Sequence, residues 1–266
     1  MLGKLLKYEI RAMGRVMLPL YLAMIFVAGL FAFNMKVGMS AGARRLLQQF
    51  AIITGVLFFA AVMAVFIVMF IMVVQRFYKN LLGTEGYLMF TLPVNTFEHI
   101  ASKAVSSMLW ILVGFVAGAC AGFLMIFMVS DVPEFLREMK SAFDMVFGSG
   151  IPVGRIVMIV LLIILAILES LCQIYAAISV GHQFNSHRLL FSIIAYIAFG
   201  IAEIAISSIP FIRRFVGRGI YLASVTAGQA NFSILQEAPA FVVLLIGIAV
   251  YGIITWYLLD RRLNLE

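Results

Sequence analysis

The chain has 266 residues, of which 64% are hydrophobic and only 12% are charged. A soluble domain is about half apolar and about a quarter charged, so this chain lacks the charge to cover a water-facing surface. Its net charge of +7 comes from scattered basic residues beside apolar runs, which favours anionic lipid headgroups over nucleic acid as their contact. The composition therefore predicts an integral membrane protein, and we expect it in the cell membrane.

The first fifteen residues, 1–15, predict an amphipathic helix that lies in the membrane interface. One face is apolar and the opposite face is basic, and Glu9 interrupts the apolar face. The apolar positions are Leu2, Leu5, Leu6, Ile10 and Met13, and the basic positions are Lys4, Lys7, Arg11 and Arg15. The other interpretation is a simple basic flank that sets topology. The run Val16–Phe33 is too long for the core of a secretory signal, so we expect a retained first span.

Six apolar runs are long enough to cross the hydrocarbon core as helices, which needs about 20 residues. They are Val16–Phe33, Phe50–Val74, Ile100–Val129, Ile156–Val180, Leu189–Ser207 and Ala240–Leu259. Barrel strands alternate polar and apolar residues and these runs do not, so the predicted class is an all-α integral membrane protein with six transmembrane helices. Six spans place both termini on one side. Basic residues divide almost evenly between the sides, and the longer outer segments count for less, which predicts cytoplasmic termini.

The segment 76–95, between the second and third runs, reads RFYKNLLGTEGYLMFTLPVN. Arg76–Leu82 is expected to continue the second span as a helix, with Phe77 and Leu81 on one face. The sequence GTEG, which begins at Gly83, then stops that helix, because glycine is a common helix terminator.

Tyr87–Leu92 follows as a compact apolar stretch that Pro93 ends. With cytoplasmic termini this stretch is on the cytosolic side. Its apolar side chains then either insert into the membrane interface or occupy a groove in another protein. Glu85 beside it is available to pair with a basic residue of that partner.

The chain contains none of the common catalytic or nucleotide-binding motifs. It lacks a P-loop, H-E-x-x-H, C-x-x-C and G-x-S-x-G. His182 and His187 are five residues apart, which is poor spacing for one helical face. Cys120 and Cys172 lie inside apolar runs and are expected to be packing residues. We therefore expect no catalytic residue, no metal site and no cofactor in this chain.

Three glycines, Gly114, Gly118 and Gly122, recur at every fourth position of the third span. Small residues at this spacing let helices approach closely. The ridge either packs within one subunit or forms a seam between two subunits.

Two acids, Glu169 and Glu203, lie inside apolar runs, and Glu169 shares a helical face with Gln173. Acids within the membrane are costly and face protein or water. They either contact a substrate or proton along a pathway or make hydrogen bonds between helices.

Three arginines lie in the long segment 208–239: Arg213, Arg214 and Arg218. Contact with lipid headgroups is one interpretation of them, and binding of an anionic substrate is the other.

The sequence RFYKNLLGTEGYLMFTLPV resembles the first cytosolic loop of the ABC type-2 permease family, the membrane subunits of bacterial ATP-binding-cassette exporters. LLKYEIRAMGRVMLPLY and YLLDRRLNLE resemble the two ends of the same family, so the resemblance covers the whole length and the six-span plan. It implies one permease domain, 1–266. Within it, 1–15 is the connecting helix, 76–95 holds the coupling helix and 208–239 forms small extracellular helices.

The resemblance also implies the function, a permease subunit of an ATP-driven exporter. Two permeases, identical or different, would form the pathway and bind two cytosolic ABC ATPase subunits, which carry ATP and magnesium. The expected docking surface is Tyr87, Leu88, Phe90 and Leu92, oriented by Arg76, Lys79 and Glu85. The apolar spans favour a peptide, antibiotic or lipid cargo.

Two other functions remain open. An integral membrane enzyme would use Glu169 or the histidines, although no pair of catalytic groups has convincing spacing. A membrane scaffold or sensor would bind a cytosolic partner through Tyr87–Leu92 without transport.

Overall fold

The computed structural model describes residues 2–40, 45–83, 94–144, 153–184, 186–209 and 234–261. Every regular element within these residues is a helix, in agreement with the predicted all-α class. In chain order they are α1 (Leu2–Ser40), α2 (Arg45–Phe77), the π-helix η1 (Tyr78–Leu82), α4 (Thr96–Val129), α5 (Val132–Phe143), α6 (Val153–Gly181), α7 (Arg188–Ser208) and α9 (Ile234–Arg261).

Six helices in this part of the chain are long and apolar enough to cross a membrane, and they contain the six predicted apolar runs. They cover Gly3–Val37, Gln49–Leu82, Thr96–Val129, Val153–Gly181, Arg188–Ser208 and Pro239–Arg261. α4 has 34 residues. At 1.5 Å per residue it is about 51 Å long, so its ends extend beyond a hydrocarbon core of about 30 Å.

α1 shows no break where the sequence predicts the interfacial helix 1–15 to end. It is one helix from Leu2 to Ser40 and includes Pro19. A chain that enters lipid must keep its backbone hydrogen bonds, which favours an unbroken helix across the boundary. The basic side chains of residues 4, 7, 11 and 15 are exposed, whereas Met13 is buried. The location of 1–15 in the interface stays a prediction.

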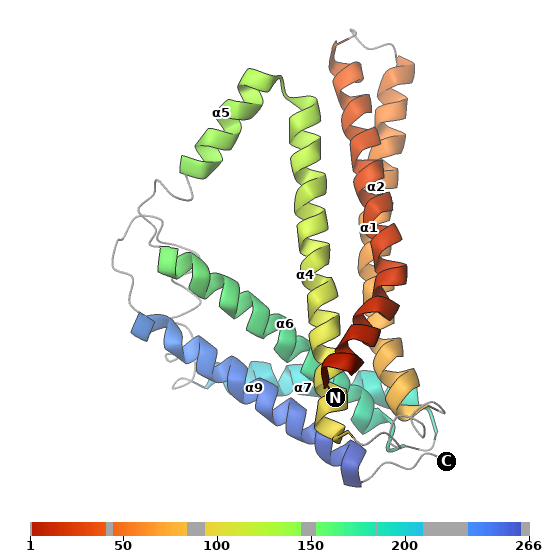
Figure 1. Cartoon of the computed structure of the whole chain (residues 1–266), viewed down its shortest axis with the longest axis vertical. Helices are drawn as coiled ribbons and strands as arrows, with labels where there is room; N and C mark the ends of the chain where they lie inside the picture. Colours follow the sequence, from red (N-terminus) through yellow and green to blue (C-terminus); the bar gives the residue numbers. More distant parts are fainter. Residues whose placement is uncertain are drawn as a thin grey trace. The chain divides into compact units, whose positions relative to one another are not determined.

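The chain divides into two compact units. Unit 2 comprises Lys7–Val73 and Leu109–Met145. In it, α1, α2 and the second part of α4 lie side by side (Figure 1). Its core consists mainly of methionine and alanine, with one tyrosine and one tryptophan. The buried members are Met13, Met17, Tyr21, Met24, Ala28, Val65, Trp110, Ala117 and Ala121.

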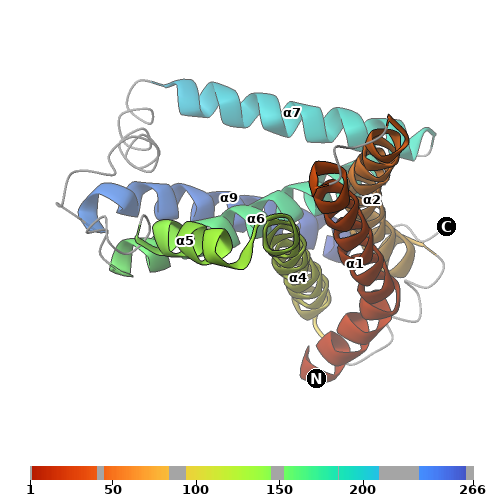
Figure 2. The same ribbon diagram turned by 90° about the horizontal axis from the view of Figure 1, so that it is seen from above.

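Unit 1 comprises Met1–Leu6, Val74–Met108 and Val146–Glu266. Within it, α6 packs against both α7 and α9 (Figures 1 and 2). Its apolar core contains Cys172 and Ala176 of α6 and Tyr251 of α9. The ring of Tyr251 lies 5.3 Å, centre to centre, from that of Phe199 on α7.

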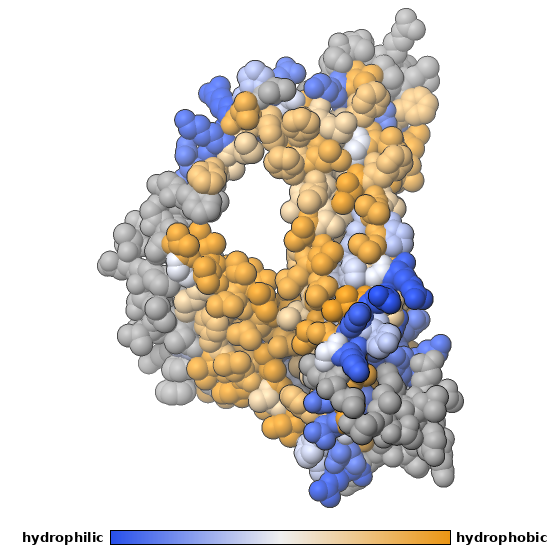
Figure 3. Space-filling model, in the orientation of Figure 1, coloured by the Kyte–Doolittle hydropathy of each residue, from blue (hydrophilic) through white to orange (hydrophobic). Residues whose placement is uncertain are grey.

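The surface has the polarity expected of membrane-spanning helices. Hydrophobic residues cover the visible sides of α6 and α9, and hydrophilic residues gather over α5 and over the N-terminal part of α1 (Figure 3). Large apolar side chains are exposed along the spans, such as Phe59 and Phe70 on α2 and Ile204 on α7. In lipid such exposure is not costly, because the surrounding hydrocarbon is as apolar as the side chains.

Candidate functional site

The first flank of the segment 76–95 is anchored in unit 1 by buried apolar side chains. The helical backbone continues through η1 and ends at Gly83, which confirms the predicted stop. Phe77 and Leu81, expected on one face, are both fully buried. The ring of Phe77 stacks on that of Tyr175 from α6, with centres 4.2 Å apart and planes 7° apart. This contact attaches the flank to the fourth span.

The next residue, Tyr78, adds a second contact between this flank and the end of α6. Its ring packs edge-on against His182, with centres 5.9 Å apart. His182 is 7% exposed, and its Nδ1 has no hydrogen-bond partner among the described residues. Burial lowers the pKa of His182 below its ordinary value, and the positive charge of Arg188 lowers it further. The site therefore favours the neutral imidazole.

The second flank is attached to α9. The carbonyl of Asn95 accepts hydrogen bonds from the backbone N–H groups of Glu98 at 2.9 Å and His99 at 3.3 Å, where α4 begins. The hydroxyl of Thr96 donates to a carboxylate oxygen of Asp260, near the end of α9, at 3.3 Å. The two flanks of 76–95 are thus bonded to two different helices of unit 1.

A buried polar face runs along the first turns of α4. Its members are His99, Ser102, Lys103, Ser106 and Ser107, and each is at most 2% exposed. Their spacing of three and four residues places them on one side of the helix. Ser107 and Tyr175 share a hydrogen bond between their hydroxyls at 3.1 Å. Tyr175 therefore joins α4 to the first flank through Phe77.

This polar face was not part of the predicted site. The run Ile100–Val129 has a high mean hydropathy, which hides a polar stripe confined to one helix face. The regular spacing of the five polar residues from 99 to 107 was a signal in the sequence that could have revealed it.

Only two of the predicted docking residues lie within the described part of the chain. Arg76 is half-buried at the end of α2, and Lys79 is exposed on η1. The remaining five lie outside the described residues: Glu85, Tyr87, Leu88, Phe90 and Leu92. Their docking role stays a prediction, as do the roles of Arg213, Arg214 and Arg218, which also fall outside.

The predicted pathway acids are brought near one another in unit 1, on neighbouring helices. Glu203 on α7 accepts a hydrogen bond from the hydroxyl of Tyr251 on α9. Glu169 on α6 lies against Gly247 of α9, where an added Cβ would collide with its carboxylate. Gln173, one turn further along α6, is buried. Glu203 thus makes a hydrogen bond between helices, and a pathway role for the three residues stays a prediction.

The glycine ridge of the third span has two different environments. A Cβ on Gly114 would come within 2.9 Å of the hydroxyl oxygen of Tyr21, so this glycine packs within its own unit. The Tyr21 hydroxyl donates to the carbonyl of Trp110 at 2.8 Å. A Cβ on Gly118 or Gly122 would meet no atom within 4 Å. Those two positions are open in the described part of the chain.

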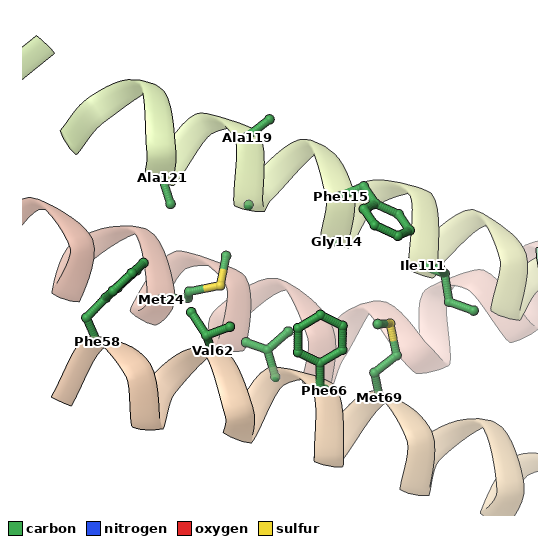
Figure 4. A pocket seen from close by; sticks show the side chains of 12 residues that line it. Met24, Phe58, Val62, Phe66, Met69, Ile111, Gly114, Phe115, Ala119 and Ala121 are labelled. Atoms are coloured by element: carbon green, nitrogen blue, oxygen red, sulfur yellow. The ribbon is translucent and has the colours of Figure 1, made fainter. Parts of the chain in front are cut away.

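A cavity of about 450 Å³ opens beside this ridge, between α1, α2 and α4 of unit 2 (Figure 4). Its lining is apolar and includes Met24, Phe66, Met69 and Phe115. The volume falls in the range of about 300–1,000 Å³ that is typical of ligand sites. Because the walls offer hardly any polar group, only hydrocarbon-like groups would fit this cavity well.

The described residues contain no group of three or more His, Cys, Asp or Glu side chains that could hold a metal ion. Cys120 is exposed and Cys172 is buried, and both are free thiols. His187 precedes α7 in a left-handed backbone conformation, with φ of 57°.

The described residues thus combine six helices that are able to cross a membrane with contacts that attach both flanks of segment 76–95 to unit 1. Comparisons with known protein families, with curated proteins and with solved structures find no match for this chain.

Proposed function

We propose that this chain is the membrane-spanning permease subunit of an ATP-driven exporter, as its resemblance to the ABC type-2 permease family implies. In this proposal the transport unit contains two permeases and two cytosolic ATPases. The ATPases bind ATP and magnesium, and the chain itself forms half of the pathway for a peptide, antibiotic or lipid cargo. Six helices able to cross a membrane support this function.

The observation that carries the proposal is the attachment of both flanks of the segment 76–95 to spans. Phe77 stacks on Tyr175 of α6, and Thr96 bonds to Asp260 of α9. Close-packed interiors transmit displacement because they have little free volume. A partner that moves this segment would therefore move α6 and α9 with it. A coupling element needs that property, whereas a loop that only connects two spans does not.

The docking step in this proposal uses the apolar stretch Tyr87–Leu92. On the cytosolic side, its aromatic and leucine side chains lose contact with water when they enter a groove of the ATPase. Glu85, Arg76 and Lys79 orient the contact through charge. Closure of the ATPase pair around ATP then favours one conformation of the spans over another, because the ATPase binds the two conformations with different affinity.

The test is a double substitution within the docking segment, Glu85→Lys with Phe90→Ala. The purified permease is reconstituted in liposomes with the ABC ATPase that copurifies with it, and ATP hydrolysis is measured with and without permease. We expect the unaltered permease to change the hydrolysis rate and the double variant to lose most of that effect. The matched control is Glu138→Lys with Phe70→Ala, the same two kinds of change at exposed positions of α5 and α2.

Three outcomes would count against the proposal. The first is a failure of any ABC ATPase to copurify. The second is equal coupling in the double variant and in the unaltered protein. In the third, the ATPase binds tightly but its hydrolysis rate does not respond to the permease, which would favour a membrane scaffold or sensor.

A further inference from the structure

α5 is an amphipathic helix between the third and fourth spans that the sequence reasoning did not anticipate. It covers Val132–Phe143, and only two residues separate it from the end of α4. Apolar side chains recur at the helical spacing 135, 136, 139 and 143, whereas the other faces carry mostly charged and polar groups. With 12 residues α5 is too short to span a bilayer, so its apolar face needs another environment.

One residue of this apolar face is buried and fixes α5 to the end of α4. Phe135 is 7% exposed. Its ring packs edge-on against Phe123 and Phe127 of α4, with both pairs of ring centres 5.2 Å apart. Lys36, near the end of α1, forms an ion pair of 3.9 Å with Asp131 at the corner between α4 and α5. These contacts, all within unit 2, hold α5 at the end of the third span (Figure 1).

The rest of the face is exposed and adjoins a helix that is long and apolar enough to cross a membrane. Leu136 is 52% exposed and Met139 is 46% exposed. Phe123 and Phe127, which contact Phe135 on the same face, belong to a membrane-spanning helix and are themselves about half exposed. The exposed apolar positions of α5 are therefore connected through Phe135 to the exposed rings of α4, beside the polar corner that Ser130 and Asp131 form.

The charges of α5 identify the kind of surface that it fits. The charged residues around its polar side, including the one that follows the helix, are Glu134, Arg137, Glu138, Lys140 and Asp144. Three acids and two bases give no excess of positive charge. An interfacial helix that depends on anionic lipids carries mainly Lys and Arg on its polar face. Contact of α5 with lipid would therefore depend on apolar burial alone.

We propose that α5 lies in the membrane interface at the end of the third span and inserts Leu136 and Met139 among lipid acyl chains. The polar side faces water, and Phe135 sets the depth because it is packed against α4. The occupant of the apolar face is bilayer lipid of any headgroup charge. The proposal does not depend on the permease function.

Spin labels at neighbouring positions test this placement in the full chain. Cys120 and Cys172 are first changed to Ala, and single cysteines are introduced as Leu136→Cys, Met139→Cys, Arg137→Cys and Ser141→Cys. Each variant is labelled and reconstituted in pure phosphatidylcholine. Electron paramagnetic resonance then measures collision of the label with oxygen, which concentrates in lipid, and with a water-soluble nickel chelate.

Labels at 136 and 139 should collide with oxygen several-fold more than with the chelate, and labels at 137 and 141 should show the reverse. The same pattern should persist when anionic phosphatidylglycerol is added and when salt is raised. Equal chelate access at all four positions would place α5 in water and overturn the proposal. Low access of both reagents at 136 and 139 would show that protein covers them, from a second copy or a partner, and would overturn it as well.

Because Leu136→Cys and Met139→Cys change exposed positions, we expect both variants to fold. Leu136→Glu is a second check that needs no label. It should reduce the fraction of molecules that keep the α5 segment protected from added protease in liposomes, and Arg137→Glu should not. Equal protection in the two variants would contradict insertion of Leu136.

Discussion

The two units of this chain hold their helices together by different means. In unit 1, the helices meet through specific polar and aromatic contacts, such as the stack of Phe77 on Tyr175 and the hydrogen bond of Tyr175 with Ser107. In unit 2, the core is mostly methionine and alanine, and a few directional bonds centre on Tyr21 and Trp110. Both units thus contain ring pairs and hydrogen bonds between helices, and they differ in the side chains around these contacts: a buried polar face of α4 in unit 1 and mostly methionine and alanine in unit 2.

The difference indicates which unit has the more uniquely defined packing. Apolar side chains gain little by leaving lipid for protein, so helices in a bilayer associate through close packing and hydrogen bonds. Methionine and alanine pack closely but tolerate several arrangements, because methionine is flexible and alanine is small. A buried aromatic stack whose ring also shares a hydrogen bond tolerates few arrangements. We therefore expect substitutions at the buried stack of Phe77 on Tyr175 to cost more than substitutions among the methionine and alanine side chains of unit 2.

The largest effect is expected for Phe77→Ala in unit 1. It removes a fully buried ring that stacks on Tyr175, and truncation of a buried Phe costs about 3–5 kcal/mol in unfolding free energy. The measurement is denaturant unfolding of the purified protein in micelles. Phe70→Ala, at a 59% exposed position of α2 in unit 2, is the control and should stay within about 0.5 kcal/mol of the unaltered protein. Equal losses in the two variants would show that burial and stacking of the Phe77 ring are not the source of its effect.

A smaller effect is expected for Gly181→Ala, at the end of α6. The added Cβ would lie 2.5 Å from the backbone nitrogen and 2.7 Å from the Cα of Ser192 on α7, so the two helices must separate. Such overpacking costs about 1–3 kcal/mol. Gly118→Ala in unit 2 meets no atom within 4 Å, and alanine favours a helix over glycine by about 1 kcal/mol. The melting temperature should therefore fall for Gly181→Ala, and it should stay the same or rise for Gly118→Ala.

The smallest effect concerns acidification around His182. Its pKa is lowered in the folded protein, first by burial and then by Arg188, whereas an unfolded histidine titrates near about 6.5. The contribution of neutral His182 to the free energy of unfolding therefore has its full value above about pH 6.5. Below it the unfolded chain binds the proton before the folded protein does, so stability falls as the pH decreases until the lowered pKa is reached. Melting temperatures at pH 7.5 and 5.5 measure this loss.

His182→Gln should flatten this dependence. His187→Asn is the control, because asparagine tolerates the left-handed backbone at that position. If His187→Asn flattened the dependence and His182→Gln did not, the buried histidine would not be its source.

Much of the fold could be predicted because the signal of a membrane span is local. A run of about 20 apolar residues identifies a span without knowledge of its neighbours, and all six runs correspond to helices in the structure. The end of the helical backbone at Gly83 was predictable for the same reason. The boundary at residue 15 was not, because hydropathy reports where a helix meets lipid and carries no information on whether its backbone continues.

The candidate site was less predictable because its contacts join residues far apart in the chain. No local pattern pairs Phe77 with Tyr175 or Thr96 with Asp260, since tertiary packing decides which faces meet. Two signals were present and not used: the polar stripe from 99 to 107 and the apolar spacing of α5. Both are periodic patterns on one helix face, which mean hydropathy over a long window averages away.

The five-residue π-helix Tyr78–Leu82 has a consequence for the length of this part of the chain. A π-turn holds more residues per turn than an α-turn, and isolated π-segments of this kind lie within or at the ends of ordinary helices. Four α-helical residues turn through about 400°, nearly the same angle as five π-helical residues, so deleting one residue here would restore α-helical winding without rotating the chain that follows. A one-residue deletion in the regular α-helix before this turn would instead rotate Leu81 and Leu82 by about 100° and move them out of their buried positions. The π-turn thus holds one more residue than an α-turn while it keeps the direction in which the chain leaves the second span.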